Sequence, residues 1–134
     1  MRLTLYPFCR CWVAGYGKDD KGQFSFIQKK VDVPIYDRLR CQERLRQELS
    51  GLGNSNGFEL LPGELCAGGE PGKDSCEGDG GQALVCQSDS GHWHAVGLVA
   101  WGVGCAKPDV PGVYVNVHHY LDFINAAHSN TIRG

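Results

Sequence analysis

Cysteine and histidine are the residues of this chain that could support covalent or metal chemistry. The sequence holds seven cysteines and five histidines in 134 residues. Many cysteines in a short, glycine-rich chain are typical of a disulfide-linked extracellular domain. Because the number is odd, at least one cysteine is left over, and the residues alone leave the pairing of the others open.

Zinc binding is the rival use of these side chains. The two pairs Cys9-x-Cys11 and His92-x-His94 each have their members two residues apart, so on a strand they point to the same side. Structural zinc sites favour wider cysteine spacing than Cys9 and Cys11 have. We therefore expect no metal or cofactor, and we expect His94 to lie at or near the surface of a strand.

The composition places the chain among soluble globular domains. Hydrophobic residues make up 42% and charged residues 21% of the sequence, which argues against disorder. Thirteen basic and fifteen acidic residues give a net charge of −2. This balance offers no basic footprint for nucleic acid or for an anionic membrane, so we expect neither as a partner.

Export is indicated by the cysteines but not by the first residues. Residues 1–8 are too short for the apolar core of a signal peptide and show no cleavage site. The longest apolar run, 95–106, contains three glycines and falls short of the ~20 residues that span a membrane. We therefore expect the chain to be part of a longer secreted protein.

Short strands dominate the predicted secondary structure. Alternating apolar residues and turn residues predict six strands, at 12–17, 27–35, 60–66, 83–86, 93–101 and 112–117. A last segment, 118–128, has the apolar spacing of a helix. Six short strands separated by turns predict an antiparallel barrel or sandwich.

One further helix is predicted between the second and third strands. Asp37 can cap it, and it should run to about Ser50. Its apolar stripe consists of Cys41, Leu45 and Leu49. Its charged side chains are expected in solvent; they are Arg38, Arg44, Arg46 and Glu48.

A long glycine-rich loop, 67–82, precedes the fourth strand, and loops of this length in a compact domain are usually functional. Residues 74–86 read DSCEGDGGQALVC. This segment resembles, without a gap, the nucleophile loop D-S-C-x-G-D-S-G-G-P-L-V-C of trypsin-like (chymotrypsin-fold) serine proteases. Gln82 and Ala83 depart from that pattern.

Three other stretches support the resemblance in the right order. Residues 11–17 (CWVAGYG), 98–105 (LVAWGVGC) and 111–117 (PGVYVNV) are similar to the family's C-W-V-x-G-W-G, V-S-W-G-x-G-C and P-G-V-Y-x-x-V. The resemblance implies an all-β fold: the second, six-stranded antiparallel barrel of the family, with an intermediate and a C-terminal helix. It implies a barrel at 11–128, a non-family or poorly ordered start at 1–10 and a tail at 129–134.

The most important departure from the family is Gly80, which stands where the nucleophilic serine belongs. Glycine has no side chain and cannot form an acyl-enzyme. The family's A-A-H-C and D-I-A-L motifs, which hold the catalytic histidine and aspartate, are missing, and all five histidines follow the nucleophile loop. The resemblance therefore implies a catalytically inactive homologue.

Binding residues of the family have counterparts in this chain. The resemblance implies that the backbone N–H groups of Gly78 and Gly80 correspond to the oxyanion hole. It also implies a specificity pocket that attracts Lys or Arg, formed by Asp74, Ser75, Trp101, Gly102 and Gly112. Asp79 corresponds to the acid that pairs with a freed N-terminus, and we expect it to be unpaired here.

The resemblance also implies a disulfide pattern. The implied pairs are Cys11–Cys86, Cys41–Cys66 and Cys76–Cys105, and Cys9 is left without a counterpart. Cys9 could pair with a missing segment, link a dimer, or belong to a start region that is foreign to the domain.

The G-D-G-G sequence at 78–81 resembles one branch in particular, the clip-domain serine protease homologues of arthropod haemolymph. Residues 30–34 (KVDVP) and 64–74 (ELCAGGEPGKD) resemble the same branch. Its members act as non-proteolytic cofactors in melanization and immune cascades. The resemblance implies protein partners, such as cascade proteases and prophenoloxidase-like or complement-like factors. Two alternatives remain: a fragment of an active trypsin-like endopeptidase, and a secreted disulfide-rich binding module.

Overall fold

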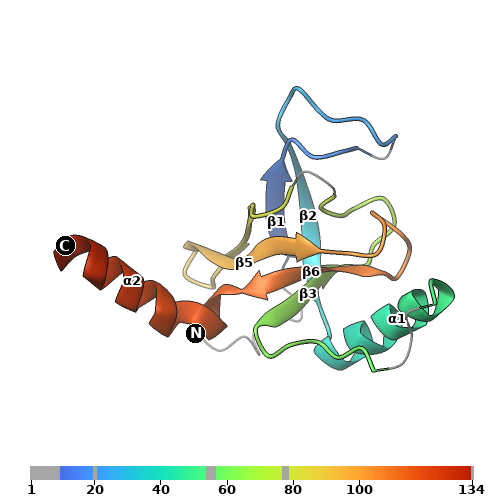
Figure 1. The fold of residues 1–134 in the computed structure, drawn as a ribbon. Helices are drawn as coiled ribbons and strands as arrows, with labels where there is room; N and C mark the ends of the chain where they lie inside the picture. The colour runs from blue at the N-terminus through green and yellow to red at the C-terminus, as the bar shows by residue number, and fades with distance from the viewer. Residues whose placement is uncertain (1–9, 20, 54–56, 77–78, 134) are drawn as a thin grey trace.

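The computed structural model describes residues 10–19, 21–53, 57–76 and 79–133. Six antiparallel strands close into a barrel in the order β1-β2-β3-β6-β5-β4 (Figure 1). The strands are β1 (Arg10–Gly15), β2 (Lys29–Tyr36), β3 (Glu64–Gly68), β4 (Ala83–Gln87), β5 (Trp93–Trp101) and β6 (Pro111–Asn116). The predicted six-stranded barrel is confirmed.

The alternating pattern of the first two strands places one face of each inside the barrel. In β1, Cys11 and Val13 are buried, and in β2 Val33 is buried between partly buried neighbours. β1 pairs with both β2 and β4, and this double pairing closes the barrel. Ile27, which the alternation assigned to the second strand, lies before β2 and is exposed.

The third strand begins later than its apolar sequence predicts. β3 starts at Glu64, whose backbone N–H donates to the Leu61 carbonyl at 3.0 Å. This turn contains Pro62 and Gly63, two residues that favour turns and interrupt strands. Leu60 is buried nevertheless, because it packs in the core beneath the intermediate helix.

The hydrophobic core has two parts. The larger part fills the barrel with residues from all six strands: Cys11, Val13, Val33, Leu65, Ala67, Leu84, Cys86, Val96 and Tyr114. The smaller part lies between the barrel and α1 (Arg38–Gly51), and consists of Cys41, Leu45, Leu60, Cys66, Val110 and Val113. Asp37 caps α1, as predicted: its carboxylate accepts the Arg40 backbone N–H at 2.9 Å.

The arginines of α1 were expected to lie in solvent. Their side chains also donate hydrogen bonds to backbone carbonyls of neighbouring segments. Arg38 donates to the carbonyls of residues 60, 61 and 64, and Arg46 donates to the Phe58 carbonyl at 2.7 Å. Arg44 donates to the Asp109 carbonyl at 2.9 Å and pairs with Glu48 at 3.2 Å. Carbonyls in a segment without a strand partner need donors, and these side chains supply them.

The end of the chain turns away from the barrel. A 3₁₀ turn, η2 (Val117–Tyr120), leads into α2 (Leu121–Arg133), which projects from the barrel (Figure 1). Residues 121–130 of α2 are all exposed, and the helix continues beyond residue 128, where the sequence pattern ends it. Among the described residues, no helix has the length and apolar character that a membrane crossing would need.

Candidate functional site

A cavity of about 420 Å³ contains most of the binding residues expected from the sequence. The predicted pocket residues that line it are Asp74, Ser75, Trp101, Gly102 and Gly112, and Gly80 lines it as well. One wall comes from the loop before β4, and another comes from the end of β5 and the connection to β6. Residues that are distant in sequence therefore share a single binding space.

Asp74 gives this cavity an acidic character. Its Oδ2 accepts the Ala106 backbone N–H at 3.1 Å, whereas its buried Oδ1 has no hydrogen-bond partner among the described residues. Burial raises the pKa of Asp74 to about 6. A Cβ at Gly112 would lie 3.0 Å from Oδ1, so a larger residue there would crowd the carboxylate. An unsatisfied buried carboxylate beside open space favours a cationic guest.

Covalent and polar links hold the two walls together. The Cys76–Cys105 disulfide joins the loop before β4 to the β5–β6 connection. The hydroxyl oxygens of Ser75 and Tyr114 lie 3.1 Å apart, and Tyr114 is fully buried in the barrel. Sequence reasoning missed Tyr114, although its alternate position in a strand pattern was a sign that it faces inward.

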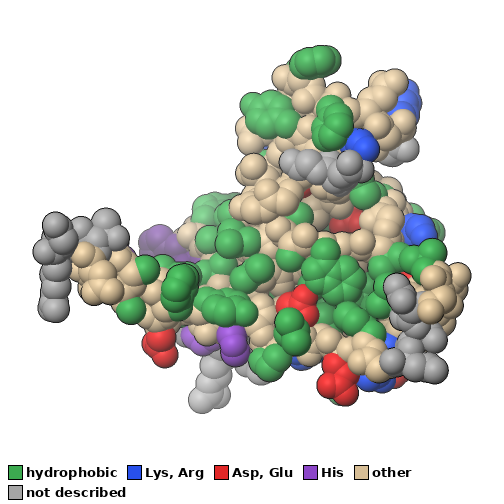
Figure 2. Space-filling model, in the orientation of Figure 1, with side chains coloured by type: hydrophobic (Ala, Val, Ile, Leu, Met, Phe, Trp, Pro, Cys, Tyr) green, Lys and Arg blue, Asp and Glu red, His purple; other side chains and the backbone are tan. Residues whose placement is uncertain are grey.

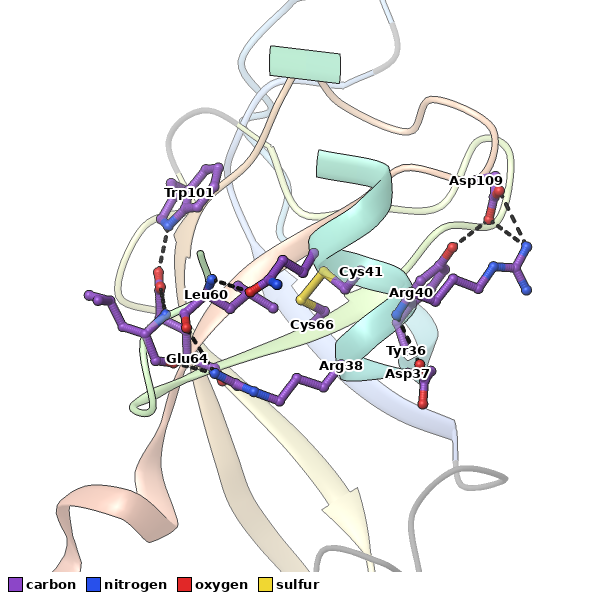
Figure 3. The surroundings of a disulfide bond; sticks show 12 residues. Tyr36, Asp37, Arg38, Arg40, Cys41, Leu60, Glu64, Cys66, Trp101 and Asp109 are labelled. Carbon is purple, nitrogen blue, oxygen red and sulfur yellow. Dashed lines mark hydrogen bonds and ion pairs between the residues drawn. A yellow bond between two sulfur atoms is a disulfide. The ribbon is translucent and has the colours of Figure 1, made fainter. Parts of the chain in front are cut away.

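Trp101, the aromatic residue of the cavity wall, is held by contacts with residues that do not line the cavity. The indole N–H of Trp101 donates to the Glu64 carboxylate at 2.7 Å (Figure 3). The Trp101 ring also meets the Phe58 ring edge to face, with the ring centroids 5.5 Å apart. Neither Glu64 nor Phe58 was singled out from the sequence. No local pattern marked them, because their contacts with Trp101 join segments that are far apart in the chain.

A second polar cluster holds the β5–β6 connection against α1. Asp109 has a left-handed backbone, with φ of 55°, and accepts hydrogen bonds from the Tyr36 hydroxyl at 2.6 Å and from Arg40 at 3.2 Å (Figure 3). Burial, followed by the hydrogen bond to Asp109, raises the pKa of Tyr36 to about 12. This cluster anchors the segment that carries the cavity wall, and the sequence analysis did not find it.

Asp79 is paired, contrary to expectation. Its carboxylate accepts the backbone N–H of Gly17 at 2.8 Å and that of Cys76 at 3.0 Å. A Cβ at Gly17 would come within 2.5 Å of the same carboxylate, so this approach requires glycine. The reason for the difference is that the segment after β1 lies against Asp79 and supplies a donor from the backbone.

Of the two glycines assigned to the oxyanion hole, the structure describes Gly80 but not Gly78. Gly78 lies outside the described residues. Gly80 is exposed, and a Cβ built on it would have no heavy atom within 4 Å. The backbone therefore has room for a side chain at this position.

The three disulfides implied by the resemblance are all present: Cys11–Cys86, Cys41–Cys66 and Cys76–Cys105. Cys9 lies outside the described residues. Because the sulfur of Cys11 is bonded to Cys86, it cannot serve as the zinc thiolate of a Cys9-x-Cys11 site. His94 lies on β5 and is exposed, as predicted.

Comparison with known proteins agrees with this geometry. The family model described as Trypsin matches residues 7–124. The chain belongs to the trypsin family. It is 46% identical over 87% of its length to "Phenoloxidase-activating factor 2" of Galleria mellonella, covering 39% of that protein. It is 48% identical over 92% of its length to "Inactive CLIP domain-containing serine protease A3" of Aedes aegypti, covering 26% of that protein.

A third relative extends the same comparison. "Inactive CLIP domain-containing serine protease A28" of Anopheles gambiae is 42% identical over 87% of the chain, which covers 30% of that protein. The chain thus spans less than half the length of these relatives. The names of the two mosquito proteins describe inactive proteases, and both contain a CLIP domain.

Proposed function

We propose that this trypsin-family chain is a non-catalytic binding component of an extracellular immune protease cascade. In this proposal it holds a basic side chain of a partner protein in the Asp74 cavity and cleaves nothing. Two observations support it: the cavity has a buried, unpartnered carboxylate oxygen, and glycine stands at the position of the nucleophile.

The lack of catalysis is argued from the chemistry of Gly80. Acyl transfer in this family needs a side-chain nucleophile, and a glycine residue offers only a backbone N–H and C=O. Every histidine of the chain follows the nucleophile loop, and none lines the cavity. A peptide bound in the cavity would therefore meet backbone at the point where attack would begin.

Binding of a cation is argued from Asp74. A lysine or arginine side chain that entered the cavity would give the Asp74 Oδ1 its missing partner. Arginine can also present two parallel donors to a carboxylate, which adds directional selectivity. The partner would then be a protein that exposes an arginine or lysine in an extended loop.

The cascade setting is argued from the relatives. Their printed names include a phenoloxidase-activating factor and inactive CLIP-domain proteases of insects. Three disulfides in a chain of this size suit a secreted protein. Cascade proteases and phenoloxidase precursors are the partners we propose.

Binding of p-aminobenzamidine, an aryl amidine that imitates an arginine side chain, tests the cavity. We expect measurable binding at pH 8 by isothermal titration calorimetry. Asp74→Asn should weaken it by at least roughly 30-fold, since the cation loses its buried charged partner. Asp89→Asn is the matched control, because Asp89 is exposed and lies outside the cavity. Equal affinity of the chain and the Asp74→Asn variant would refute the proposed pocket.

The Gly80→Ser variant tests the absence of catalysis. A Cβ fits at this position, so the variant should fold normally, yet its hydroxyl would lack a histidine base in the cavity. We expect no hydrolysis of an arginine ester by either form and no labelling of the unmodified chain by a fluorophosphonate. Ester hydrolysis by the variant that a serine-reactive inhibitor abolishes would contradict this expectation.

A further inference from the structure

The segment that joins β1 to β2 projects from the barrel as a hairpin (Figure 1). We call residues 16–28 the β1–β2 hairpin; residue 20 within it is not among the described residues. Lys18 and Phe24 form an isolated antiparallel bridge across it. Its far end stands clear of both helices (Figure 1).

Backbone hydrogen bonds give the hairpin a defined shape. The Asp19 Oδ1 accepts the N–H groups of Lys21 at 2.9 Å and Gln23 at 3.0 Å, and the Asp19 N–H donates to the Gln23 carbonyl at 2.9 Å. Farther along, the Ile27 N–H donates to the Ser25 hydroxyl at 3.2 Å. The backbone of this hairpin therefore has a defined shape before any partner arrives, which lowers the entropy cost of binding.

Large apolar side chains cover the hairpin although it lies outside the core. Phe26 is fully exposed, at 101% of its reference area, and Ile27 is 76% exposed. Tyr16 and Phe24 are both more than half exposed. The space-filling view shows hydrophobic side chains gathered on this projection, apart from those of the barrel face (Figure 2). Grouped apolar side chains on a protruding element are typical of an interaction site.

Lysines accompany these apolar side chains. Four of the six lysines of the sequence, at positions 18, 21, 29 and 30, fall within or beside the hairpin. Residues 16–30 also contain two aspartates. This segment therefore carries four positive and two negative charges, a formal +2, whereas the net charge of the whole chain is −2. The surface is therefore apolar with a basic surround, and electrostatic complementarity favours an acidic partner.

We propose that the β1–β2 hairpin is a docking site for an acidic, apolar segment of another protein. The partner segment would pack large apolar side chains against Phe24, Phe26 and Ile27, and its carboxylates would meet the neighbouring lysines. Phe26 would be the main anchor, since exposed aromatic side chains on rigid elements commonly dominate binding energy. The apolar side chains of this site lie outside the Asp74 cavity, although Lys18, Lys29 and Lys30 line an adjoining pocket that Asp74 also borders. The proposal does not depend on the function proposed for the Asp74 cavity.

A protein partner fits the hairpin better than a lipid surface does. Three of the lysines contact residues of the chain: the Lys18 ammonium lies 5.2 Å from the Phe24 ring centroid, the Lys30 ammonium 5.0 Å from that of Trp12, and the Lys29 ammonium 4.0 Å from the Asp19 carboxylate. Charges at fixed positions suit discrete carboxylates with a matching arrangement. A membrane would instead offer diffuse charge that needs no such geometry.

Selection from a phage-displayed library of random peptides on the immobilised chain tests the proposal. We expect enriched peptides to combine Asp or Glu with large apolar residues. Synthetic copies should bind Phe26→Ser and Lys21→Glu about tenfold or more weakly than the unchanged chain. Leu52→Ser is the matched control, since Leu52 is 69% exposed at the C-terminal cap of α1, outside the hairpin, and it should leave binding unchanged.

Other results of these experiments would contradict the proposed docking site. Enriched peptides that are neutral or basic, or that bind Phe26→Ser as well as the unchanged chain, would overturn the proposal, as would a selection without enrichment. Phe26-dependent binding to phosphatidylserine-containing vesicles without peptide binding would assign the hairpin to a membrane instead. Because Phe26 is fully exposed, its replacement should not unfold the chain, and circular dichroism would verify this. Asp74→Asn should bind the peptides normally.

Discussion

At the scale of residues, the cavity combines a glycine, which offers no side chain, with an aspartate whose carboxylate is buried. Gly80 offers no nucleophile and has free space around it. Asp74 keeps a buried carboxylate that accepts a backbone N–H from Ala106 but has no charged partner among the described residues. The charge of Asp74 therefore costs folding energy unless a ligand compensates it.

The raised pKa of Asp74 predicts how stability changes with pH. The folded-state pKa of about 6 lies above the ordinary 3.8, so the folded chain binds more protons than the unfolded chain between these values. Stability should therefore fall as pH rises from about 4 to about 6, by up to about 3 kcal/mol, and then stay level with respect to this group. Urea denaturation at about pH 4 and at about pH 7 should show this fall.

The Asp74→Asn variant provides the comparison for that experiment. Asparagine does not titrate, so this component of the pH dependence should disappear in the variant. Saturating p-aminobenzamidine should reduce it in the unchanged chain, because the amidinium stabilises the ionised carboxylate. An identical pH dependence in the chain and the variant would show that Asp74 is not the group responsible.

At the scale of elements, the two helices have different relations to the barrel. α1 buries Cys41 and Leu45 and is tied to the neighbouring loops through Arg38, Arg44 and Arg46. Residues 121–130 of α2 are exposed on every side, with Phe123 at 72%. An isolated helix of this length is marginal in water, because tertiary packing supplies most helix stability.

This difference predicts unequal hydrogen exchange. In the chain on its own, amides of α2 should exchange far faster than amides of α1, by roughly 100-fold or more in protection factor, since fraying needs no disruption of the core. Exchange followed by mass spectrometry on peptides from each helix would measure it. Protection of α2 equal to that of α1 would mean that α2 is packed against another surface in solution.

At the scale of the whole molecule, the disulfides link parts that the chain order separates. Cys11–Cys86 joins β1 to β4 across the seam of the barrel and encloses a sequence separation of 75 residues. Cys41–Cys66 attaches α1 to β3 with a separation of 25 residues. All four of these cysteines are almost completely buried.

The number of residues that each disulfide encloses predicts which of the two disulfides contributes more to stability. Replacing Cys11 and Cys86 together by alanine should cost about 4.5 kcal/mol, and replacing Cys41 and Cys66 about 3.5 kcal/mol, from the loop entropy regained by the unfolded chain. The burial of the two pairs is similar, so cavity effects should nearly cancel in the comparison. Urea denaturation of both double variants tests the order, and a larger loss for the Cys41–Cys66 pair would contradict it.

Much of the barrel and the cavity could be predicted from the sequence. The alternating apolar residues of β1 and β2 and the turn residues between strands are local patterns, and local patterns predict strands. The resemblance to trypsin-like proteases implied a specificity pocket with Asp74, Trp101 and Gly112. The three residues line one cavity, and its specificity for Lys or Arg stays a prediction. The strand expected from residue 60 begins at Glu64, because apolar content alone does not distinguish a strand from a buried turn.

The sequence by itself determined what Gly80 cannot do, because the absence of a side chain is independent of conformation. It also indicated the disulfide pairs through resemblance to a known family. Only the tertiary structure decided that Asp79 is paired with backbone, that Asp109 anchors the cavity wall to α1, and that the aromatic residues of the β1–β2 hairpin are exposed. These properties depend on contacts between segments distant in the chain, and local sequence patterns do not record such contacts.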